Sequence, residues 1–145
     1  MVLPASLNKI RGERTSRRPP RWTGLALVGL VPLGLYSKVY AGPAAIWVNN
    51  SLCGAFYVLF WCLLVFWFWP RVRPWRIALA VLAVTCLLEF LQCWHPPWLE
   101  WLRSFWLGQT LLGTTFAWSD FAYYFVGAGL GWLWMQYFHS AKAGR

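Results

Sequence analysis

Four apolar stretches with almost no charge constrain the fold of this chain more than any other feature. They run from Trp22 to about Tyr40, from Leu52 to Trp69, from Ile77 to Trp94 and from Ser119 to Phe138. About 20 residues of α-helix cross a hydrocarbon layer about 30 Å thick. Because lipid offers no partner to a backbone N–H or C=O group, each stretch is predicted to cross a membrane as an α-helix.

The composition agrees with this interpretation and excludes several classes of protein. Hydrophobic residues make up 59% of the chain and charged residues 12%, and there are 13 tryptophans. Soluble domains carry about 25% charged residues. A soluble domain of 145 residues could not bury this much apolar surface, whereas a bilayer accepts it. The sequence therefore excludes a soluble enzyme, a disordered chain and a secreted disulfide scaffold.

The first apolar stretch has two interpretations. It contains Gly29, Pro32 and Gly34, which predict a short membrane span kinked at Pro32. A cleaved signal peptide is the alternative, with Val39-Tyr40-Ala41 as a weak cleavage site. The basic leader of 21 residues is long for a signal peptide, which favours the span.

The segment between the third and fourth apolar stretches is mixed in character. His95-Pro96-Pro97 ends the third span, because proline cannot continue a helix. From Trp98 to Phe116, polar residues interrupt Trp and Leu. This pattern predicts an interfacial helix with a turn around Gly113. A re-entrant segment is the alternative.

The basic residues are distributed unequally, and this sets the predicted orientation. If both termini are cytoplasmic, 11 of the 13 Lys and Arg residues lie on the cytoplasmic side, and only Lys38 and Arg103 lie on the outer side. Such an excess is typical of cytoplasmic flanks. The eleven are Lys9, Arg11, Arg14, Arg17, Arg18, Arg21, Arg71, Arg73, Arg76, Lys142 and Arg145. Because these residues flank spans and form no polar platform interleaved with aromatic residues, we expect no nucleic-acid partner.

The predicted fold is all-α. It is a polytopic membrane protein, a four-transmembrane-helix bundle with an outer-side interfacial helix between spans 3 and 4. Residues 1–21 are predicted to be a disordered basic cytoplasmic tail, 22–138 the four-span membrane domain, and 139–145 a second cytoplasmic tail. We expect no cofactor, and no metal site, since His95 and His139 lie on opposite sides.

A group of polar residues is predicted to meet near the outer side. Glu89 lies inside the third span, where an acid is costly, and Thr85 and Gln92 share its helical face. Asp120 begins the fourth span, and Arg103 is the cation nearest to it in sequence. An arginine between two carboxylates lowers the cost of burying them. We therefore expect Glu89, Gln92, Arg103 and Asp120 to form one cluster that is the functional site.

The fourth span carries further candidates on the stripe that follows Asp120. Tyr123 and Tyr124 are candidate ligand-binding residues, together with Gln92 and Arg103. Gly127 and Gly131 are predicted to form a helix-packing face. The third and fourth spans are expected to touch along Thr85–Glu89–Gln92 and Asp120–Tyr124–Gly127–Gly131.

Each charged candidate also has a structural interpretation. Asp120 follows Ser119 and could cap a helix N-terminus, where a carboxylate is favourable. Arg103 could pair with Glu100, three residues earlier. The sequence leaves open whether Glu89 and Asp120, the candidate catalytic groups, are functional or clamp helices together.

The same residues resemble a known family. The pattern consists of Leu88-Glu89-Phe90-Leu91-Gln92, His95-Pro96-Pro97-Trp98-Leu99, Leu102-Arg103, Leu107-Gly108, Leu112-Gly113, Phe116, Ser119-Asp120, Tyr123-Tyr124 and Gly127. It resembles domain-of-unknown-function family 2809, small bacterial membrane proteins, and more distantly the VanZ-like proteins. The likeness spans roughly Leu33 to Trp134 and is strongest from Leu88 to Gly127. Near Asn49-Asn50-Ser51, where the family often has Gly-Asp, this chain has no acid.

The resemblance implies a four-span protein of the bacterial inner membrane, and the VanZ likeness implies a role in the cell envelope. The first hypothesis is an outer-side polar site for a lipid headgroup or a lipid-linked envelope intermediate. In it the desolvated Glu89 acts as acid or base, Arg103 contacts an anionic group, and Gln92 and Asp120 orient the ligand. The second is a non-enzymatic bundle that is a subunit or assembly partner of a larger membrane complex. A proton-coupled carrier is less favoured, because four spans leave little room for alternating access. Whether the protein is an enzyme stays open.

Overall fold

The structure is a computed structural model that describes residues 21–113 and 115–143, and every regular element within them is helical. The elements are α2 (Arg21–Val39), α3 (Ala45–Trp47), η1 (Val48–Leu52), α4 (Cys53–Phe68), α5 (Pro74–Leu91), α6 (Pro97–Arg103), α7 (Trp106–Leu112) and α8 (Trp118–Ala143). The all-α prediction is confirmed. The predicted tail over residues 1–21 lies outside the described residues except for Arg21, with which α2 begins.

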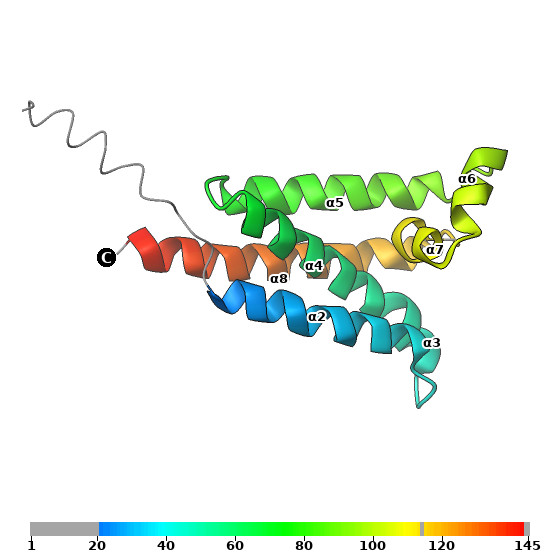
Figure 1. The fold of residues 1–145 in the computed structure, drawn as a ribbon, viewed down its shortest axis with the longest axis horizontal. Helices are drawn as coiled ribbons and strands as arrows, with labels where there is room; N and C mark the ends of the chain where they lie inside the picture. Colours follow the sequence, from blue (N-terminus) through cyan, green and yellow to red (C-terminus); the bar gives the residue numbers. More distant parts are fainter. Residues whose placement is uncertain (1–20, 114, 144–145) are drawn as a thin grey trace, which may run out of the picture.

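The four long helices pack side by side, with α4 and α8 at the centre of the bundle. α5 packs against both of them, and α2 packs against α4. Figure 1 shows the start of α2, the α4–α5 turn and the end of α8 at one end of the bundle. The same view places α3, α6 and α7 at the opposite end. These three segments carry or adjoin the basic residues that the sequence analysis placed on the cytoplasmic side, and in the fold they lie at the same end of the bundle.

Prolines set the bounds of α5 and α6. Pro74 and Pro97 stand in the first turn of these helices, where a missing N–H costs nothing. α5 thus starts three residues before the predicted Ile77 and ends at Leu91, three residues before the predicted Trp94. α2 is one continuous helix of 19 residues that includes Pro32.

The prediction of a single interfacial helix over residues 98–116 is wrong, because the segment forms two short helices, α6 and α7. The helix breaks after Arg103, where the Ser104 hydroxyl donates to the Trp101 carbonyl 2.6 Å away. Gly108 allows the break to close, since a Cβ there would overlap the Leu102 carbonyl. The predicted turn at Gly113 is present, with a φ of 69° that favours glycine.

Gly127 and Gly131 form a packing face, but their neighbour is α4 and not the third predicted span. A Cβ on Gly127 would overlap the Ala55 carbonyl oxygen, and one on Gly131 would lie 2.7 Å from the Cys62 Cβ atom. This part of the predicted contact is therefore wrong. α8 is central, so its glycine face meets α4 while its first turns meet α5 through Tyr124.

The outward surface of the bundle is apolar. Two helices, α2 and α5, are long and apolar enough to cross a membrane, and α4 is apolar but has 16 residues. Only 17% of the most apolar window of α2 and 28% of that of α5 are buried, whereas the core helix of a soluble protein is mostly buried. The structure thus contains two candidate membrane spans, and the four-span bundle stays a prediction at this point.

Candidate functional site

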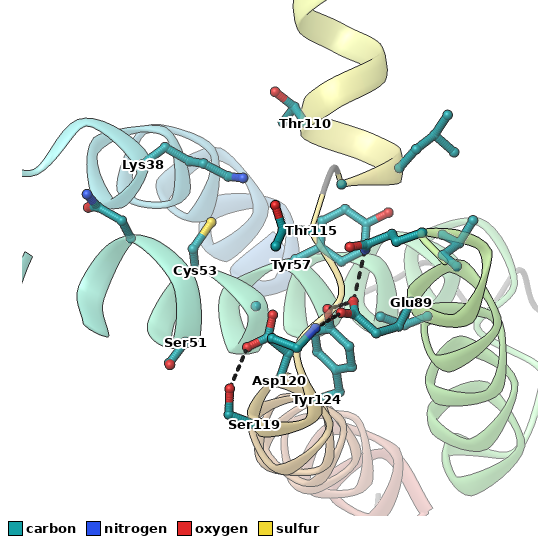
Figure 2. A pocket seen from close by; sticks show the side chains of 18 of the residues that line it. Lys38, Ser51, Cys53, Tyr57, Glu89, Thr110, Thr115, Ser119, Asp120 and Tyr124 are labelled. Carbon is teal, nitrogen blue, oxygen red and sulfur yellow. Dashed lines mark hydrogen bonds between the residues drawn. The ribbon is translucent and has the colours of Figure 1, made fainter. Parts of the chain in front are cut away.

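Glu89 is the most buried acid of the described residues and accepts three hydrogen bonds. It lies in the last turn of α5 and is 1% exposed. The Tyr124 hydroxyl donates to Oε2 over 2.5 Å, the Gln92 amide donates to Oε2 over 3.0 Å, and the Ala117 backbone N–H donates to Oε1 over 2.9 Å. Figure 2 shows these bonds converging on one carboxyl group. The three donors together occupy acceptor sites on both oxygens of the carboxyl group.

The carboxyl group of Glu89 joins two helices far apart in sequence. Ala117 directly precedes α8, so its N–H lies at the end of α8 that attracts negative charge. Tyr124 lies two turns further along the same helix and is buried. The predicted contact between the third and fourth spans is therefore confirmed at Glu89 and Tyr124.

Gln92 caps the end of α5 beside Glu89 and is 7% exposed. Its amide nitrogen faces a carboxylate, so the orientation of the amide is fixed by chemistry. Gly113 passes directly over this amide, because a Cβ there would overlap Nε2. The side-chain amide oxygen of Gln92, Oε1, is buried and has no hydrogen-bond partner within the described part of the chain.

A cavity of about 700 Å³ lies next to these residues, at the end of the bundle that carries α3 and α7. Its walls come from α2, α3, η1, α4, α5, α7 and α8, and Glu89, Gln92, Asp120 and Tyr124 all line it. The Tyr57 hydroxyl donates to the Leu111 carbonyl over 3.1 Å and ties α4 to α7 at the wall. Cavities of this size are typical of small-molecule sites.

Asp120 and Tyr123 lie differently around this cavity. Asp120, in the first turn of α8, is half-buried and accepts a hydrogen bond from the Ser119 hydroxyl over 3.3 Å. Figure 2 shows its carboxylate beside the cavity. Tyr123 is absent from the lining, and its hydroxyl accepts a hydrogen bond from Trp47 Nε1 over 2.7 Å. Neighbours on a helix point about 100° apart, so only Tyr124 of the two tyrosines faces the cavity.

The prediction that Arg103 joins the cluster is wrong. Its guanidinium is 5% exposed and donates to the carbonyls of Leu91 and Trp94 over 3.0 and 3.1 Å. It also pairs with Glu100 at 3.0 Å, as the alternative interpretation proposed. The last carbonyls of a helix lack intrahelical partners and attract cations. Arg103 therefore secures the corner between α5 and α6 and does not line the cavity.

Lys38 lines the cavity, whereas the sequence analysis used it only in the count of charges that set the predicted orientation. It stands in the last turn of α2, and Figure 2 shows its side chain directed over the cavity. Its position at the predicted outer end of the first span, level with Asp120, could have indicated this role. Ser51 and Thr115 also line the cavity, and no sequence pattern marked them.

Metal binding has no support in the described chain. Residues 21–113 and 115–143 contain no group of three or more His, Cys, Asp or Glu side chains that could hold a metal ion.

Comparison with known proteins gives one match. A family model described as "Protein of unknown function (DUF2809)" matches residues 44–128, more than half of the chain. The matched region contains η1, the cavity residues of α5 and the first turns of α8. No curated protein and no solved structure matches the chain. The predicted resemblance to this family is confirmed, and the more distant VanZ likeness stays a prediction.

Proposed function

Because the chain belongs to the DUF2809 family, for which no function is described, we propose a function from geometry. The protein is a four-span protein of the bacterial cytoplasmic membrane whose outer-side cavity binds the headgroup of a phospholipid or lipid-linked envelope intermediate. One observation carries the proposal: a polar cavity of about 700 Å³ lies at the end of a bundle with an apolar outward surface.

The outward surface supports the membrane part of the proposal. Large apolar side chains of three long helices are exposed along their lengths, although soluble monomers rarely expose apolar patches above a few hundred Å². They include Leu25, Val28, Val31, Leu79, Val84, Leu87, Phe125, Val126, Leu130 and Leu133. A hydrocarbon layer would cover these groups without cost.

α4 and α8 complete the four spans in this proposal. η1 and α4 follow each other without a break from Val48 to Phe68, which adds a further turn to the 16 residues of α4. α8 has 26 residues and packs along α4 and α5. Since α8 itself exposes Phe125, Leu130 and Leu133, as its neighbour α5 exposes Leu79, Val84 and Leu87, α8 shares the environment of α5.

The orientation predicts the results of reporter fusions. Alkaline phosphatase fused after residue 45 or residue 98 should be active, and the same enzyme fused after residue 73 should be inactive, because the basic turn is retained in the cytoplasm. Green fluorescent protein at the same three positions, the matched control, should give the reverse pattern. Phosphatase activity at residue 73 would contradict the topology.

Exposed tryptophans support a position of the cavity at headgroup depth. The end of the bundle that holds the cavity also carries a group of tryptophans that are about half exposed or more. They are Trp47, Trp94, Trp98, Trp101, Trp106 and Trp118. Tryptophan is enriched at the membrane–water interface. The polar lining of the cavity therefore lies where headgroups lie.

Glu89 acts in this proposal as a positioning residue. Its three acceptor bonds are made by the protein itself, which leaves Lys38 and Asp120 as the charged groups at the cavity. By holding the start of α8 against α5, Glu89 fixes the cavity wall that carries Asp120.

Blocking the cavity tests the proposal. Thr115 lines the cavity and is exposed, so Thr115→Trp should fill the space without disturbing the core. Protein purified in mild detergent should retain phospholipid in native mass spectrometry, and Thr115→Trp should lower the retained fraction about tenfold, a loss of roughly 1.4 kcal/mol. Ser104→Trp, at an exposed position away from the cavity, is the matched control and should retain lipid normally. Equal retention by both variants would favour the role as a subunit of a larger membrane complex.

A further inference from the structure

The cavity holds two opposite charges that do not meet. Lys38 approaches from α2 and Asp120 from α8, and both line the same space. Within the described residues the only ion pair is that of Arg103 with Glu100. The ammonium of Lys38 and the carboxylate of Asp120 are therefore both free to pair with a ligand.

Among the described residues, the buried side-chain atoms of the cavity that lack a hydrogen-bond partner are both amide oxygens. Asn49 Oδ1 and Gln92 Oε1 are buried, and neither has a hydrogen-bond partner in the described part of the chain. Both residues line the cavity, and Gln92 is more than nine-tenths buried. Both atoms are carbonyl oxygens, which accept and do not donate. A buried acceptor without a partner is costly, so the cavity calls for a ligand that donates N–H or O–H groups.

The two unpaired charges at the cavity, one of each sign, disfavour ligands of a single sign. A purely anionic group would approach Lys38 but also face the carboxylate of Asp120. A purely cationic group would face Lys38. Juxtaposed like charges disfavour binding, so a ligand with a cation and an anion side by side suits the cavity best.

We propose that the cavity recognises the phosphoethanolamine headgroup of a phospholipid, with Lys38 on the phosphate and Asp120 and Gln92 on the primary ammonium. This inference rests on the proposed function and names the chemistry of its ligand. A primary ammonium brings a positive charge and three N–H donors, which can serve the carboxylate of Asp120 and the amide oxygen of Gln92 together. A trimethylated ammonium keeps the charge but has no N–H to donate, and a glycerol headgroup has donors but no positive charge.

The test compares headgroups on the wild-type protein, so it does not depend on the folding of a variant. Protein in nanodiscs is offered phosphatidylethanolamine, its mono- and dimethylated forms, phosphatidylcholine and phosphatidylglycerol with identical acyl chains, and bound lipid is identified by native mass spectrometry. Binding should fall with each methyl group and be about tenfold weaker for phosphatidylcholine, because the carboxylate of Asp120 and the buried amide oxygen of Gln92 lose their donors. Free phosphoethanolamine should displace the bound lipid.

Two variants assign the charges. Asp120→Asn should reduce the preference for phosphatidylethanolamine over phosphatidylcholine to about threefold or less, since the ammonium loses its counter-charge. Lys38→Gln should weaken all five lipids alike, because each carries the phosphate. Arg73→Gln, which removes an exposed cation at the other end of the bundle, is the control and should change nothing.

The outcomes separate this inference from the proposed function. Equal binding of phosphatidylethanolamine and phosphatidylcholine, or preference for phosphatidylglycerol, with binding still lost in Thr115→Trp, would overturn the amine inference and leave lipid binding intact. Lipid binding that Thr115→Trp does not change would overturn both. Binding of free phosphoethanolamine without any lipid binding would overturn the proposed lipid ligand and support amine recognition.

Discussion

Replacing Glu89 with alanine should lower the free energy of unfolding by about 3–5 kcal/mol, the largest effect we expect from a single substitution. The change leaves the Tyr124 hydroxyl, the Gln92 amide and the Ala117 N–H without an acceptor in a place that is 1% exposed. Each buried donor without a partner costs about 1–3 kcal/mol. Denaturant unfolding in bicelles, followed by tryptophan fluorescence, measures the loss.

Two further variants resolve this effect into its parts. Glu89→Gln keeps one acceptor oxygen but turns an NH₂ group toward a donor, so we expect a loss of about 1–3 kcal/mol. Tyr124→Phe removes one of the three bonds and should cost about 1.5–3 kcal/mol, as for hydrogen bonds to charged groups.

Glu100→Gln is the matched control for Glu89→Gln. It makes the same chemical change at a side chain that is half exposed and paired only with Arg103. The new side chain keeps an oxygen that can accept from Arg103, and the buried guanidinium also donates to the carbonyls of Leu91 and Trp94, so this variant should lose about 1 kcal/mol at most. A Glu89→Ala protein as stable as the wild type would show that Glu89 does not hold α5 and α8 together.

Substituting glycines of α8 with alanine should change stability in opposite directions according to the neighbour of each glycine. Gly127→Ala should cost about 1–3 kcal/mol, because the new methyl group overlaps the backbone carbonyl of Ala55, which can move only with α4. Gly131→Ala places its methyl group 2.7 Å from the Cys62 Cβ atom and should be destabilising for the same reason.

Gly129→Ala is the control on the same helix. No atom lies within 4 Å of a Cβ at this position, so the substitution meets open space. Alanine is favoured over glycine in a helix interior by about 0.5–1 kcal/mol, and we expect a gain of this size. If Gly127→Ala and Gly129→Ala changed stability equally, the close approach of α8 to α4 would be contradicted. The measurement is the same unfolding titration.

Much of the fold could be predicted from local features of the sequence. The long apolar runs predicted the four long helices, and most of the predicted helix ends lie within three residues of the observed ones. This is because helix formation and apolar burial act over a single segment. Pro74 and Pro97 begin helices because of their own covalent geometry. The shared face of Glu89 and Gln92 follows from the helical period alone and holds in the structure.

The candidate site could be predicted only in part. Glu89, Gln92, Asp120 and Tyr124 line one cavity, and Arg103 and Tyr123 do not. A guanidinium donates to carbonyl oxygens as well as to carboxylates, so the sequence cannot tell which of them will be near Arg103. The carbonyls of Leu91, the last residue of α5, and of Trp94, just beyond it, came within reach and determined its place.

The sequence by itself determined where helices form, that these helices are apolar and that an acid lies within the third apolar stretch, since these properties depend on residues close together in the chain. Only the tertiary structure decided that the glycine face of α8 meets α4, and that Lys38 shares a cavity with Asp120. Lys38 and Asp120 stand on separate helices, and their distance depends on how those helices pack. Packing is set by the sum of many side-chain contacts along the bundle, and no single local pattern encodes that sum.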